Sequence, residues 1–410
     1  MRFHWFLPTT GDGHDVRSAI MTTDGFRPAA RPATVAYLTQ VARAAEHAGF
    51  EAALTPVGAG CPDPWIVCAA LTQHTERLKT LVAFRTGYAL PTLLAQQAQS
   101  FQDVSGGRLL LNVVTGGDPV EQRAYGDFLG HDARYARTGE FLDVLRRAWA
   151  GTPFDHHGEH YRVEGGGLAE PLDPAPDVYF GGASPAAERV AARHADVALM
   201  WGEPPSAIGE RIARLRDLTA SAGRELRYGL RVHVIARDTG AEAWAEAERL
   251  LAGMDPARVA EAQRRFARYD SVGQRRMVDL HRGDTRELEI HPGLWAGVGL
   301  VREGAGTALV GSYDEVAALL REYAALGVGE FVLSGWPHLE EAYRVGEYVL
   351  PRLRAAEPAA GGGRPRHETL LTDTGGTGRG AYCSRGRPGG LTWDSATASV
   401  DRPQRARTLP

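Results

Sequence analysis

Eight short apolar runs alternate with longer amphipathic segments along most of this chain. Short apolar runs predict buried β-strands, and apolar residues repeated at helical spacing predict the helices between them. Eight strand and helix pairs in succession predict an α/β fold, a TIM (β/α)8 barrel. A doubly wound sheet is the alternative, but no GxGxxG turn follows the first run. The runs cover residues 3–7, 52–55, 80–84, 109–114, 178–180, 197–200, 228–235 and 331–333.

Two insertions and a tail interrupt this pattern. Residues 152–176 follow the fourth strand and contain FDHHGEHYRV, which predicts a β-hairpin turning at Gly158. A metal site of three histidines is the alternative, but alternating residues of a hairpin point to opposite faces. Residues 238–308 follow the seventh strand, and we expect helices that end in a mobile lid over the barrel mouth. We expect one barrel domain over residues 1–354 and a disordered tail over residues 355–410, which has few apolar residues.

Charge and cysteine content exclude several classes of function. The formal net charge is −4, whereas nucleic-acid binding needs clustered positive charge. The 3 cysteines are too few and too irregularly spaced for a disulfide framework or a four-ligand zinc site. No apolar stretch is long enough to cross a bilayer. We therefore expect a cytoplasmic protein that binds neither nucleic acid nor membrane and holds no metal.

Distinctive side chains follow the ends of several predicted strands. In a TIM barrel, catalytic groups project from the C-terminal ends of the strands. Each of the five side chains named below also has a structural interpretation by itself, as a turn cap, a small core residue, a core aromatic or a helix-start residue. Their convergence on one end of the barrel favours an active site. The residues are His14, Cys61, Trp201, Trp336 and His338.

An arginine and a histidine lie on the seventh predicted strand. Arg231 and His233 are two residues apart, so their side chains share one face of the strand. An internal salt bridge to a neighbouring strand is one interpretation, because an apolar interior demands a partner for such groups. An anion site at the barrel mouth is the other, to which Arg302 adds a second positive charge from a glycine-rich loop. A sulfonate, phosphate or carboxylate fits such a site.

The sequence YFGGAS at residues 179–184 predicts a phosphate-binding turn. Gly182 leads to Ser184, which precedes a helix that begins at Pro185, so a hydroxyl and backbone N–H groups meet at a positive helix end. An ordinary N-cap is the alternative interpretation. Tyr135 is a candidate for a further hydrogen bond to the same phosphate.

Many of these motifs resemble those of alkanesulfonate monooxygenases, which are two-component enzymes of the bacterial luciferase-like superfamily. The resemblance covers roughly residues 2–352. It implies that the protein takes reduced FMN (FMNH2) from a separate NAD(P)H-dependent FMN reductase and uses O2 to cleave an alkanesulfonate into aldehyde and sulfite, in sulfur acquisition. It also implies a homotetramer. The motifs are HWFLPTTGDGH, CPDPW, VSGGR, NVVTGGDP, YFGGAS, WGEPP, GLRVHVIAR, FARYDSVGQRRM, LWAGVGLVREGAGTALVG and SGWPHLEE.

The resemblance also implies roles for individual residues. Arg231 stabilises the peroxyflavin or holds the sulfonate, and His233 orients groups at the flavin. Cys61 lines the flavin face, and Arg302 closes the lid against water. The remaining implied active-site residues are His14, Trp201, Trp336 and His338, and those implied to bind FMN are Tyr135, Ser184, Gly182, Asn112, Thr115 and Trp201.

Trp336 departs from the family pattern, which usually has tyrosine at this position. A phenol can donate and accept a hydrogen bond, whereas an indole only donates. We therefore expect slower proton transfer or a changed substrate range. Methanesulfonate or dialkyl-sulfone monooxygenases are the nearest alternatives, a deazaflavin-dependent oxidoreductase is a more distant one, and a catalytically silent flavin-binding protein is another.

Overall fold

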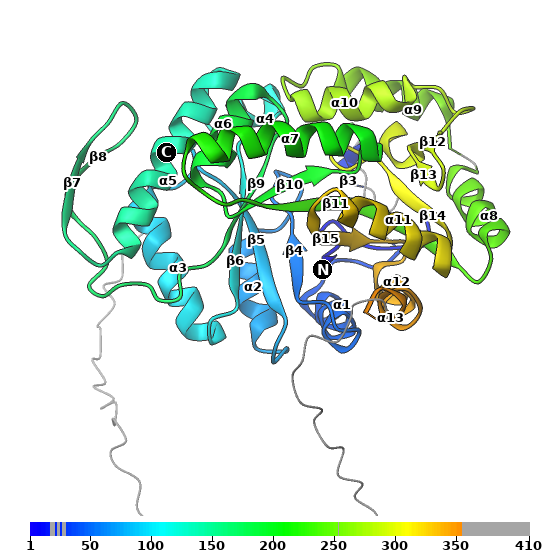
Figure 1. Ribbon diagram of the computed structural model, residues 1–410, viewed down its shortest axis with the longest axis horizontal. Coiled ribbons are helices and arrows are strands. Elements are labelled where there is room, and N and C mark those ends of the chain that lie inside the picture. Colours follow the sequence, from blue (N-terminus) through cyan, green and yellow to red (C-terminus); the bar gives the residue numbers. More distant parts are fainter. Residues whose placement is uncertain (17–20, 23–24, 27–29, 253, 355–410) are drawn as a thin grey trace, which may run out of the picture. The chain divides into compact units, whose positions relative to one another are not determined.

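Eight parallel strands close into a barrel, as the alternating apolar runs predict. The strands follow one another in the order β10, β9, β6, β5, β4, β1, β15 and β11, and β11 pairs with β10 to close the ring. Figure 1 shows the strands at the centre with helices around them. The closed ring excludes the doubly wound alternative. The barrel strands are β1 (Arg2–Phe6), β4 (Ala52–Thr55), β5 (Lys79–Arg85), β6 (Leu109–Val114), β9 (Val178–Gly181), β10 (Val197–Trp201), β11 (Arg227–Arg237) and β15 (Val328–Ser334).

The computed structural model describes residues 1–16, 21–22, 25–26, 30–252 and 254–354. The tail predicted over residues 355–410 lies outside the described residues. Two short strands, β2 (Met21–Thr22) and β3 (Gly25–Phe26), pair antiparallel with each other in the loop after β1. Among the described helices, none combines the length and the apolar composition needed to span a bilayer.

Several helices around the barrel begin at a side chain that caps their first turn. Asp63, Asp118 and Ser184 each precede a proline, and the side chain of each accepts a hydrogen bond from a backbone N–H of the first turn. Proline suits this position because its missing N–H has no partner there in any case. The helices are α1 (Val35–His47), α2 (Pro64–Thr72), α3 (Pro91–Ser105), α4 (Pro119–Ala124), α5 (His131–Trp149), α6 (Pro185–His194), α7 (Pro205–Ser221), α11 (Tyr313–Ala325), α12 (His338–Arg344), the π-helix η3 (Val345–Val349) and α13 (Leu350–Arg354).

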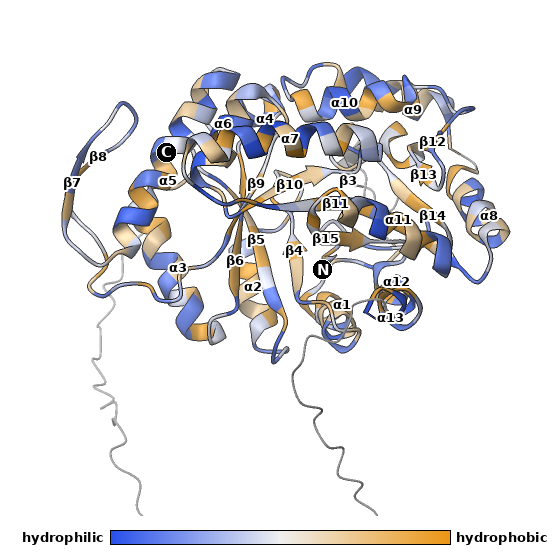
Figure 2. Cartoon of the chain, viewed as in Figure 1, coloured by the Kyte–Doolittle hydropathy of each residue, from blue (hydrophilic) through white to orange (hydrophobic). Residues whose placement is uncertain are grey.

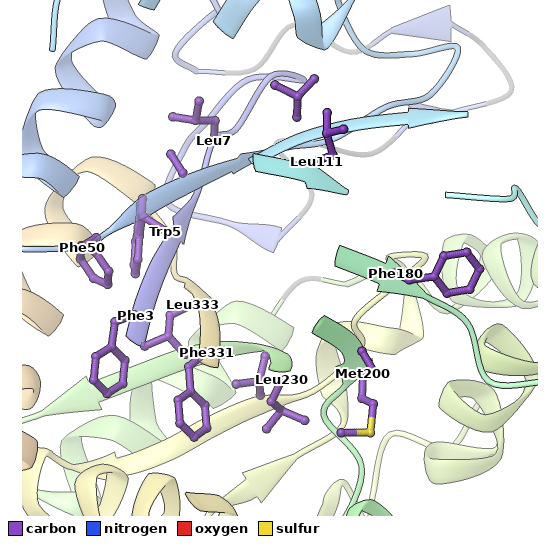
Figure 3. Packing of buried hydrophobic residues seen from close by; sticks show 14 of the residues in the cluster. Phe3, Trp5, Leu7, Phe50, Leu111, Phe180, Met200, Leu230, Phe331 and Leu333 are labelled. Atoms are coloured by element: carbon purple, nitrogen blue, oxygen red, sulfur yellow. The ribbon is translucent and has the colours of Figure 1, made fainter. Parts of the chain in front are cut away.

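The core forms where the outward faces of the strands meet the helices. Alternate residues of a strand point to opposite sides, so Phe3 and Trp5 of β1 pack with Phe331 and Leu333 of β15 in the large outer cluster, as Figure 3 shows. Phe6 belongs to a separate, smaller cluster of inward-facing residues. In Figure 2 the barrel strands are mostly white and orange, whereas the surrounding helices carry both blue and orange stretches. The buried residues of α1, for example, are mostly apolar, so most polar side chains of this helix face away from the core.

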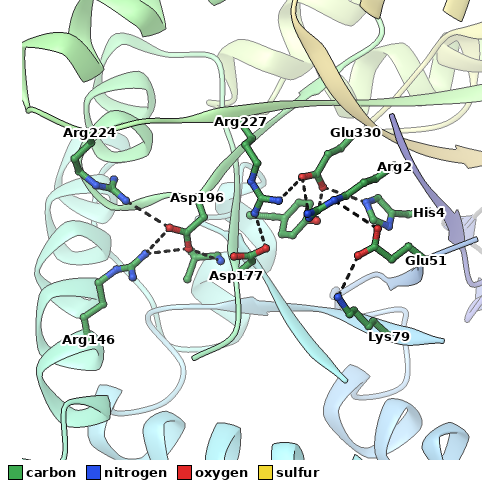
Figure 4. Close-up of polar contacts among 12 residues, drawn as sticks. Arg2, His4, Glu51, Lys79, Arg146, Asp177, Asp196, Arg224, Arg227 and Glu330 are labelled. Atoms are coloured by element: carbon green, nitrogen blue, oxygen red, sulfur yellow. Dashed lines mark hydrogen bonds and ion pairs between the residues drawn. The ribbon is translucent and has the colours of Figure 1, made fainter. Parts of the chain in front are cut away.

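A charge network centred on the buried side chains of Glu330 and His4 lies at the N-terminal end of the barrel (Figure 4). Glu330 of β15, 2% exposed, accepts a hydrogen bond from His4 Nε2 at 3.2 Å and another from the Tyr179 hydroxyl. Arg227 Nη1 lies 2.8 Å from Glu330 Oε1 and also pairs with Asp177. Each charge in this network therefore faces a group of opposite charge or a hydrogen-bond donor.

The first insertion is a hairpin, as predicted. Strand β7 (Phe154–His157) pairs antiparallel with β8 (Arg162–Gly166), and the turn between them begins at Gly158, whose N–H donates to the carbonyl of Tyr161. Figure 1 shows this hairpin beside α5. His156 of the hairpin bonds Glu140 of α5 at 2.9 Å. Within the described ranges, no group of three or more His, Cys, Asp or Glu side chains could hold a metal ion.

The second insertion contains helices followed by residues 282–308, the predicted lid, which is called the lid segment below and contacts the C-terminal ends of barrel strands. Ala305 and Thr307 in that segment bond His233 of β11 and Gly202 after β10. Its last strand, β14, pairs in parallel with the C-terminal half of β11. The mobility of this segment remains a prediction. The elements are α8 (Gly240–Leu251), α9 (Pro256–Phe266), α10 (Val272–His281), β12 (Glu289–His291), β13 (Leu294–Trp295), the 3-10 helix η2 (Gly297–Leu300) and β14 (Ala308–Ser312).

Candidate active site

Arg231 lies inside the barrel near the C-terminal end, as its place on β11 predicts. It is 5% exposed, and its guanidinium donates to Ser334 Oγ at 2.9 Å and to the Val232 carbonyl at 2.9 Å. Its Cζ lies 4.6 Å from the ring centroid of Phe6. No carboxylate in the described part of the chain pairs with it, so the internal salt bridge considered for this residue is not formed. Burial, joined by the positive charge of Arg302, lowers the pKa of Arg231 well below its usual value.

His233 is fully buried on the same strand, and its hydrogen bonds define its tautomer. Because a carbonyl only accepts, His233 Nε2 carries the proton that is donated to Ala305 O at 3.0 Å. The other nitrogen, Nδ1, accepts from the hydroxyl of Ser334 at 2.6 Å. Burial lowers the pKa of His233 well below its usual value, and Arg231 and Arg302 lower it further. His233 is therefore neutral at physiological pH.

Arg302 brings the second positive charge to the same place. Its Cζ lies 5.6 Å from the centroid of Phe6, the ring that Arg231 also contacts. Two glycines form the neck of its loop: Gly299 N–H donates to Gly306 O at 2.8 Å, and a Cβ on Gly306 would lie 2.9 Å from Gly299 Cα. Burial lowers the pKa of Arg302 more than Cys61, Glu303 and other nearby charges raise it. This close contact fixes the loop that carries Arg302, and both arginines lie over the ring of Phe6.

Trp336 stacks on His233, with ring centroids 4.5 Å apart and an angle of 23° between the rings. It is 3% exposed and belongs to an apolar cluster that includes Val298 and Leu300 of the lid segment. Its indole N–H is buried and has no hydrogen-bond partner among the described residues. Trp336 thus offers a single unused donor beside His233 and His338, where a tyrosine hydroxyl would also be able to accept.

His338 joins this cluster, whereas His14 does not. The His338 ring lies 5.9 Å from that of Phe6 and 6.2 Å from that of Trp336, between centroids. The side chain of His14 is exposed, and its carbonyl accepts a hydrogen bond from Arg249 Nη2 at 2.7 Å. The GDGH motif instead contributes Asp12, which bonds the Nδ1 of His338 at 2.9 Å. Sequence reasoning missed Asp12.

Cys61 and Trp201 border the same end of the barrel. Cys61 is partly buried, and burial raises the pKa of its thiol more than Thr9 and Arg302 lower it. A thiol of this kind is a poor nucleophile at neutral pH. The ring of Trp201 lies against Gly273 of α10, where an added Cβ would be 3.2 Å from Cζ3 of the ring. It also lies near Gly304 of the lid segment, where an added Cβ would be 3.9 Å from Cζ2.

The turn predicted to bind phosphate brings its residues to the start of α6, and phosphate binding there stays a prediction. A Cβ on Gly182 would lie 3.1 Å from the Tyr135 hydroxyl and 2.5 Å from Ala187 Cβ, so the tight approach requires glycine. Ser184 Oγ accepts from the N–H of Ala187 at 3.1 Å and so also acts as the N-cap of α6. Burial raises the pKa of Tyr135, while the hydroxyls of Thr115 and Ser184 lower it in part. Tyr135, Gly182 and Ser184 therefore meet at one helix N-terminus.

One buried carboxylate, not identified from the sequence, ties the phosphate turn to the second insertion. Glu203, in the loop after β10, pairs with Arg211 of α7 at 3.3 Å and with Arg276 of α10. The same Arg211 donates to Gly182 O at 2.7 Å. Glu203 thus links α10 to the turn that carries Gly182.

A model of luciferase-like monooxygenases matches residues 1–330 of the chain. The protein belongs to the luciferase-like monooxygenase family. Among solved structures, it is similar to a riboflavin lyase with modified FMN and riboflavin (20% identity, 87% of this chain and 91% of that chain, TM-score 0.70). It is also similar to an EDTA monooxygenase from Chelativorans sp. BNC1 (22%, 87% and 94%, 0.68) and to a long-chain alkane monooxygenase (19%, 87% and 91%, 0.69). At these identities the structural likeness shows the fold alone.

This luciferase-like monooxygenase has further unused polar atoms at the mouth of its barrel. Buried polar groups are nearly always hydrogen-bonded, and those that are not need a reason. Asn112 Oδ1 of β6 and Thr115 Oγ1 just beyond it are buried without a hydrogen-bond partner in the described ranges, and so is His338 Nε2. With the phosphate turn at Gly182, they form a set of donors and acceptors that suits a phosphorylated, heteroaromatic cofactor.

Proposed function

We propose that this protein is an FMNH2-dependent monooxygenase that cleaves the C–S bond of alkanesulfonates to give aldehyde and sulfite. The observation that carries the proposal is the pair Arg231 and Arg302, which share one aromatic ring and have no carboxylate partner among the described residues. Two such guanidiniums suit a tetrahedral anion, which a sulfonate is. Membership in the luciferase-like monooxygenase family supports the oxygenase chemistry.

The residues present fit FMN. Tyr135, Ser184 and the N-terminus of α6 would hold the phosphate, because hydroxyls and free backbone N–H groups at a positive helix end favour an anion. Asn112 and Thr115 would bond the polar edges of the ring or the ribityl chain with their unpaired oxygens. When bound, reduced FMN supplies two electrons that reduce O2, so that one oxygen atom enters the aldehyde and the other leaves as water.

Around this cofactor, the chain's own residues bind the substrate and exclude water. Arg231 and Arg302 hold the sulfonate, and the neutral His233 keeps Ser334 and the guanidinium of Arg231 in place through its fixed tautomer. The lid segment carries Arg302 and places Ala305 and Thr307 against the strand ends, which keeps water from the reacting groups. We further propose that a separate NAD(P)H-dependent FMN reductase supplies FMNH2, in the cytoplasm, and that the protein is a homotetramer.

Trp336 favours short substrates within this class, methanesulfonate included. Its ring stacks on His233 and belongs to the same apolar cluster as Val298 and Leu300, and we infer that its bulk limits the room for an alkyl chain. A methylene too many in an apolar pocket costs roughly tenfold to two-hundredfold in kcat/KM. We therefore expect kcat/KM to fall as the alkyl chain lengthens.

Sulfite release from methane-, ethane-, butane- and octanesulfonate tests the proposal. The assay contains the purified protein, FMN, NADPH, a flavin reductase and air. We expect sulfite and the matching aldehyde only when all components are present. Absence of sulfite with every sulfonate, under conditions where the protein binds reduced FMN, would overturn the proposal.

A further inference from the structure

Asp12 and His338 form a buried acid and histidine pair beside the two arginines. Asp12 is 0% exposed and His338 is 1% exposed, although 326 residues separate them in the sequence. Asp12 Oδ1 lies 2.9 Å from His338 Nδ1, and Asp12 Oδ2 accepts from the backbone N–H of His338 at 2.8 Å. The carbonyl of His338 accepts from the indole N–H of Trp5 at 3.1 Å. The histidine is therefore held at three atoms.

The carboxylate of Asp12 is saturated with donors. Besides the two from His338, it accepts from the N–H of Gly13 at 2.9 Å and from the hydroxyl of Tyr37 at 2.5 Å. Burial alone raises the pKa of Asp12, but His338 and the other donors outweigh it and lower that pKa below the usual value. Asp12 is therefore ionised at neutral pH, and each of its oxygens must accept.

These contacts define the protonation of the imidazole. Because an ionised carboxylate only accepts, Nδ1 of His338 carries a proton in the neutral ring, and Nε2 then has a free lone pair. Nε2 is buried and has no hydrogen-bond partner in the part of the chain that the structure describes. The ring lies next to Phe6, over which both arginine guanidiniums lie.

We propose that Asp12 is a positioning residue that fixes His338 with Nδ1–H and compensates the charge of the ring when Nε2 takes up a proton during turnover. The identity of the reaction in this proposal rests on the proposed function, whereas the positions of the protons on His338 do not. In the pair, Nε2 gains the proton that the carbon bonded to sulfur loses as it becomes the aldehyde carbon, Nδ1 keeps its own proton, and Asp12 stays ionised. His338 then acts as a general base whose orientation is set from outside the substrate pocket.

Charges from every neighbouring element act on His338. Arg231 of β11 and Arg302 of the lid segment disfavour its protonation, while Asp12 favours it; His233 is neutral, and the positive charge of Arg31 behind Tyr37 is paired with Glu340. Burial is the largest cause, and it lowers the pKa of His338 below the usual value. Without the carboxylate of Asp12, nothing among these groups offsets the two arginines.

Two measurements on the full chain test this inference. Neutron diffraction from crystals of the wild-type protein at pH 8 locates the protons of His338; we expect one on Nδ1 and none on Nε2. The opposite tautomer would overturn the inference whether or not the protein releases sulfite. A wild-type protein with the expected tautomer but no desulfonation would leave the positioning role standing and contradict the proposed function.

The second measurement is the pH profile of kcat/KM for Asp12→Asn, with Tyr37→Phe as the matched control. Asn removes the negative charge and turns one acceptor into a donor, so we expect the acidic limb to move to lower pH and the plateau to fall by roughly 10²-fold. Tyr37→Phe removes a donor from the same carboxylate but keeps the charge, and its acidic limb should stay in place. An unmoved limb in Asp12→Asn, or equal shifts in both variants, would contradict the role. If Asp12→Asn does not fold, the neutron measurement still decides the tautomer.

Discussion

The two ends of the barrel bury the same kinds of side chain but pair them differently. At the N-terminal end, Glu330 and Arg227 face each other at 2.8 Å and His4 donates to the same carboxylate. At the C-terminal end, Arg231 and Arg302 lie over one aromatic ring, and no carboxylate of the described residues pairs with either. Glu330 at one end and Arg231 at the other are both buried, 2% and 5% exposed, so solvent at these two residues does not account for the contrast.

The difference separates a structural role from a binding role. A buried charge that pairs with an opposite charge of the same chain holds elements together. Its hydrogen-bonding groups are already occupied, so it binds a ligand only weakly. A buried charge without such a partner is costly for the protein alone, and a bound anion removes that cost. Therefore the N-terminal end should respond to mutation through stability, and the C-terminal end through activity.

Arg231→Met should have the largest effect, a loss of activity at the C-terminal end of the barrel without a loss of stability. We expect kcat/KM for sulfonates to fall roughly 10³-fold, because a donor aimed at the substrate anion is lost. The free energy of unfolding should stay the same or rise, since a buried charge without a carboxylate partner disappears. Sulfite release and thermal unfolding measure the two.

Arg237→Met is the matched control, because Arg237 lies on the same strand but pairs with Glu341 at 3.1 Å. It should lower stability and retain most of the activity. The contrast between the two ends would lose its basis if Arg231→Met destabilised the protein as much as this control does.

Glu330→Gln should lower the stability of the protein through the N-terminal end of the barrel. It keeps the shape of the side chain but leaves Arg227 and its neighbours without the charge they face, so we expect a loss of about 3 kcal/mol in the free energy of unfolding. Denaturant unfolding measures this loss. Glu51→Gln, a partly exposed member of the same network, should cost less than about 1 kcal/mol. A loss of activity in folded Glu330→Gln larger than its loss of stability would contradict the structural assignment.

The smallest expected effect is the pH dependence of that stability. Burial by itself raises the pKa of Glu330, but His4, Tyr179 and Arg227 lower it below the usual value. A depressed folded-state pKa contributes stability that is present above the unfolded pKa, about 4.3, and is lost as pH falls below it. The stability difference between wild type and Glu330→Gln should therefore shrink from pH 6 to pH 3.5 in denaturant unfolding. A constant difference across this range would show that Glu330 does not titrate as described.

Local patterns in the sequence predicted the barrel and the inward side of β11. Continuous apolar runs mark strands that are covered on both faces. Because Arg231 and His233 are two residues apart on one strand, their side chains share a face whatever the fold. The N-cap role of Ser184 was also predictable, because the signal that starts α6 is local, whereas only the resemblance to the family placed Tyr135 beside it.

Pairings between distant residues were not predictable in this way. Asp12 meets His338 only because β1 and β15 become neighbours when the barrel closes, and nothing in the GDGH motif distinguishes its aspartate from its histidine as the inward residue. The network around Glu330 likewise joins β1, β9, β11 and β15, and Glu203 pairs with Arg276 across 73 residues. Such contacts depend on tertiary structure, so a single sequence gives no period or spacing that reveals them.

Calorimetric titration of butanesulfonate into the protein loaded with FMNH2, without oxygen, tests the central claim most directly. Without oxygen the reaction cannot proceed, so the heat reports binding alone. We predict saturable binding to wild type and to Glu330→Gln with equal affinity, and at least roughly tenfold weaker binding to Arg231→Met. Equal affinity for wild type and Arg231→Met would contradict the claim that the unpaired arginines at the barrel mouth form the anion site.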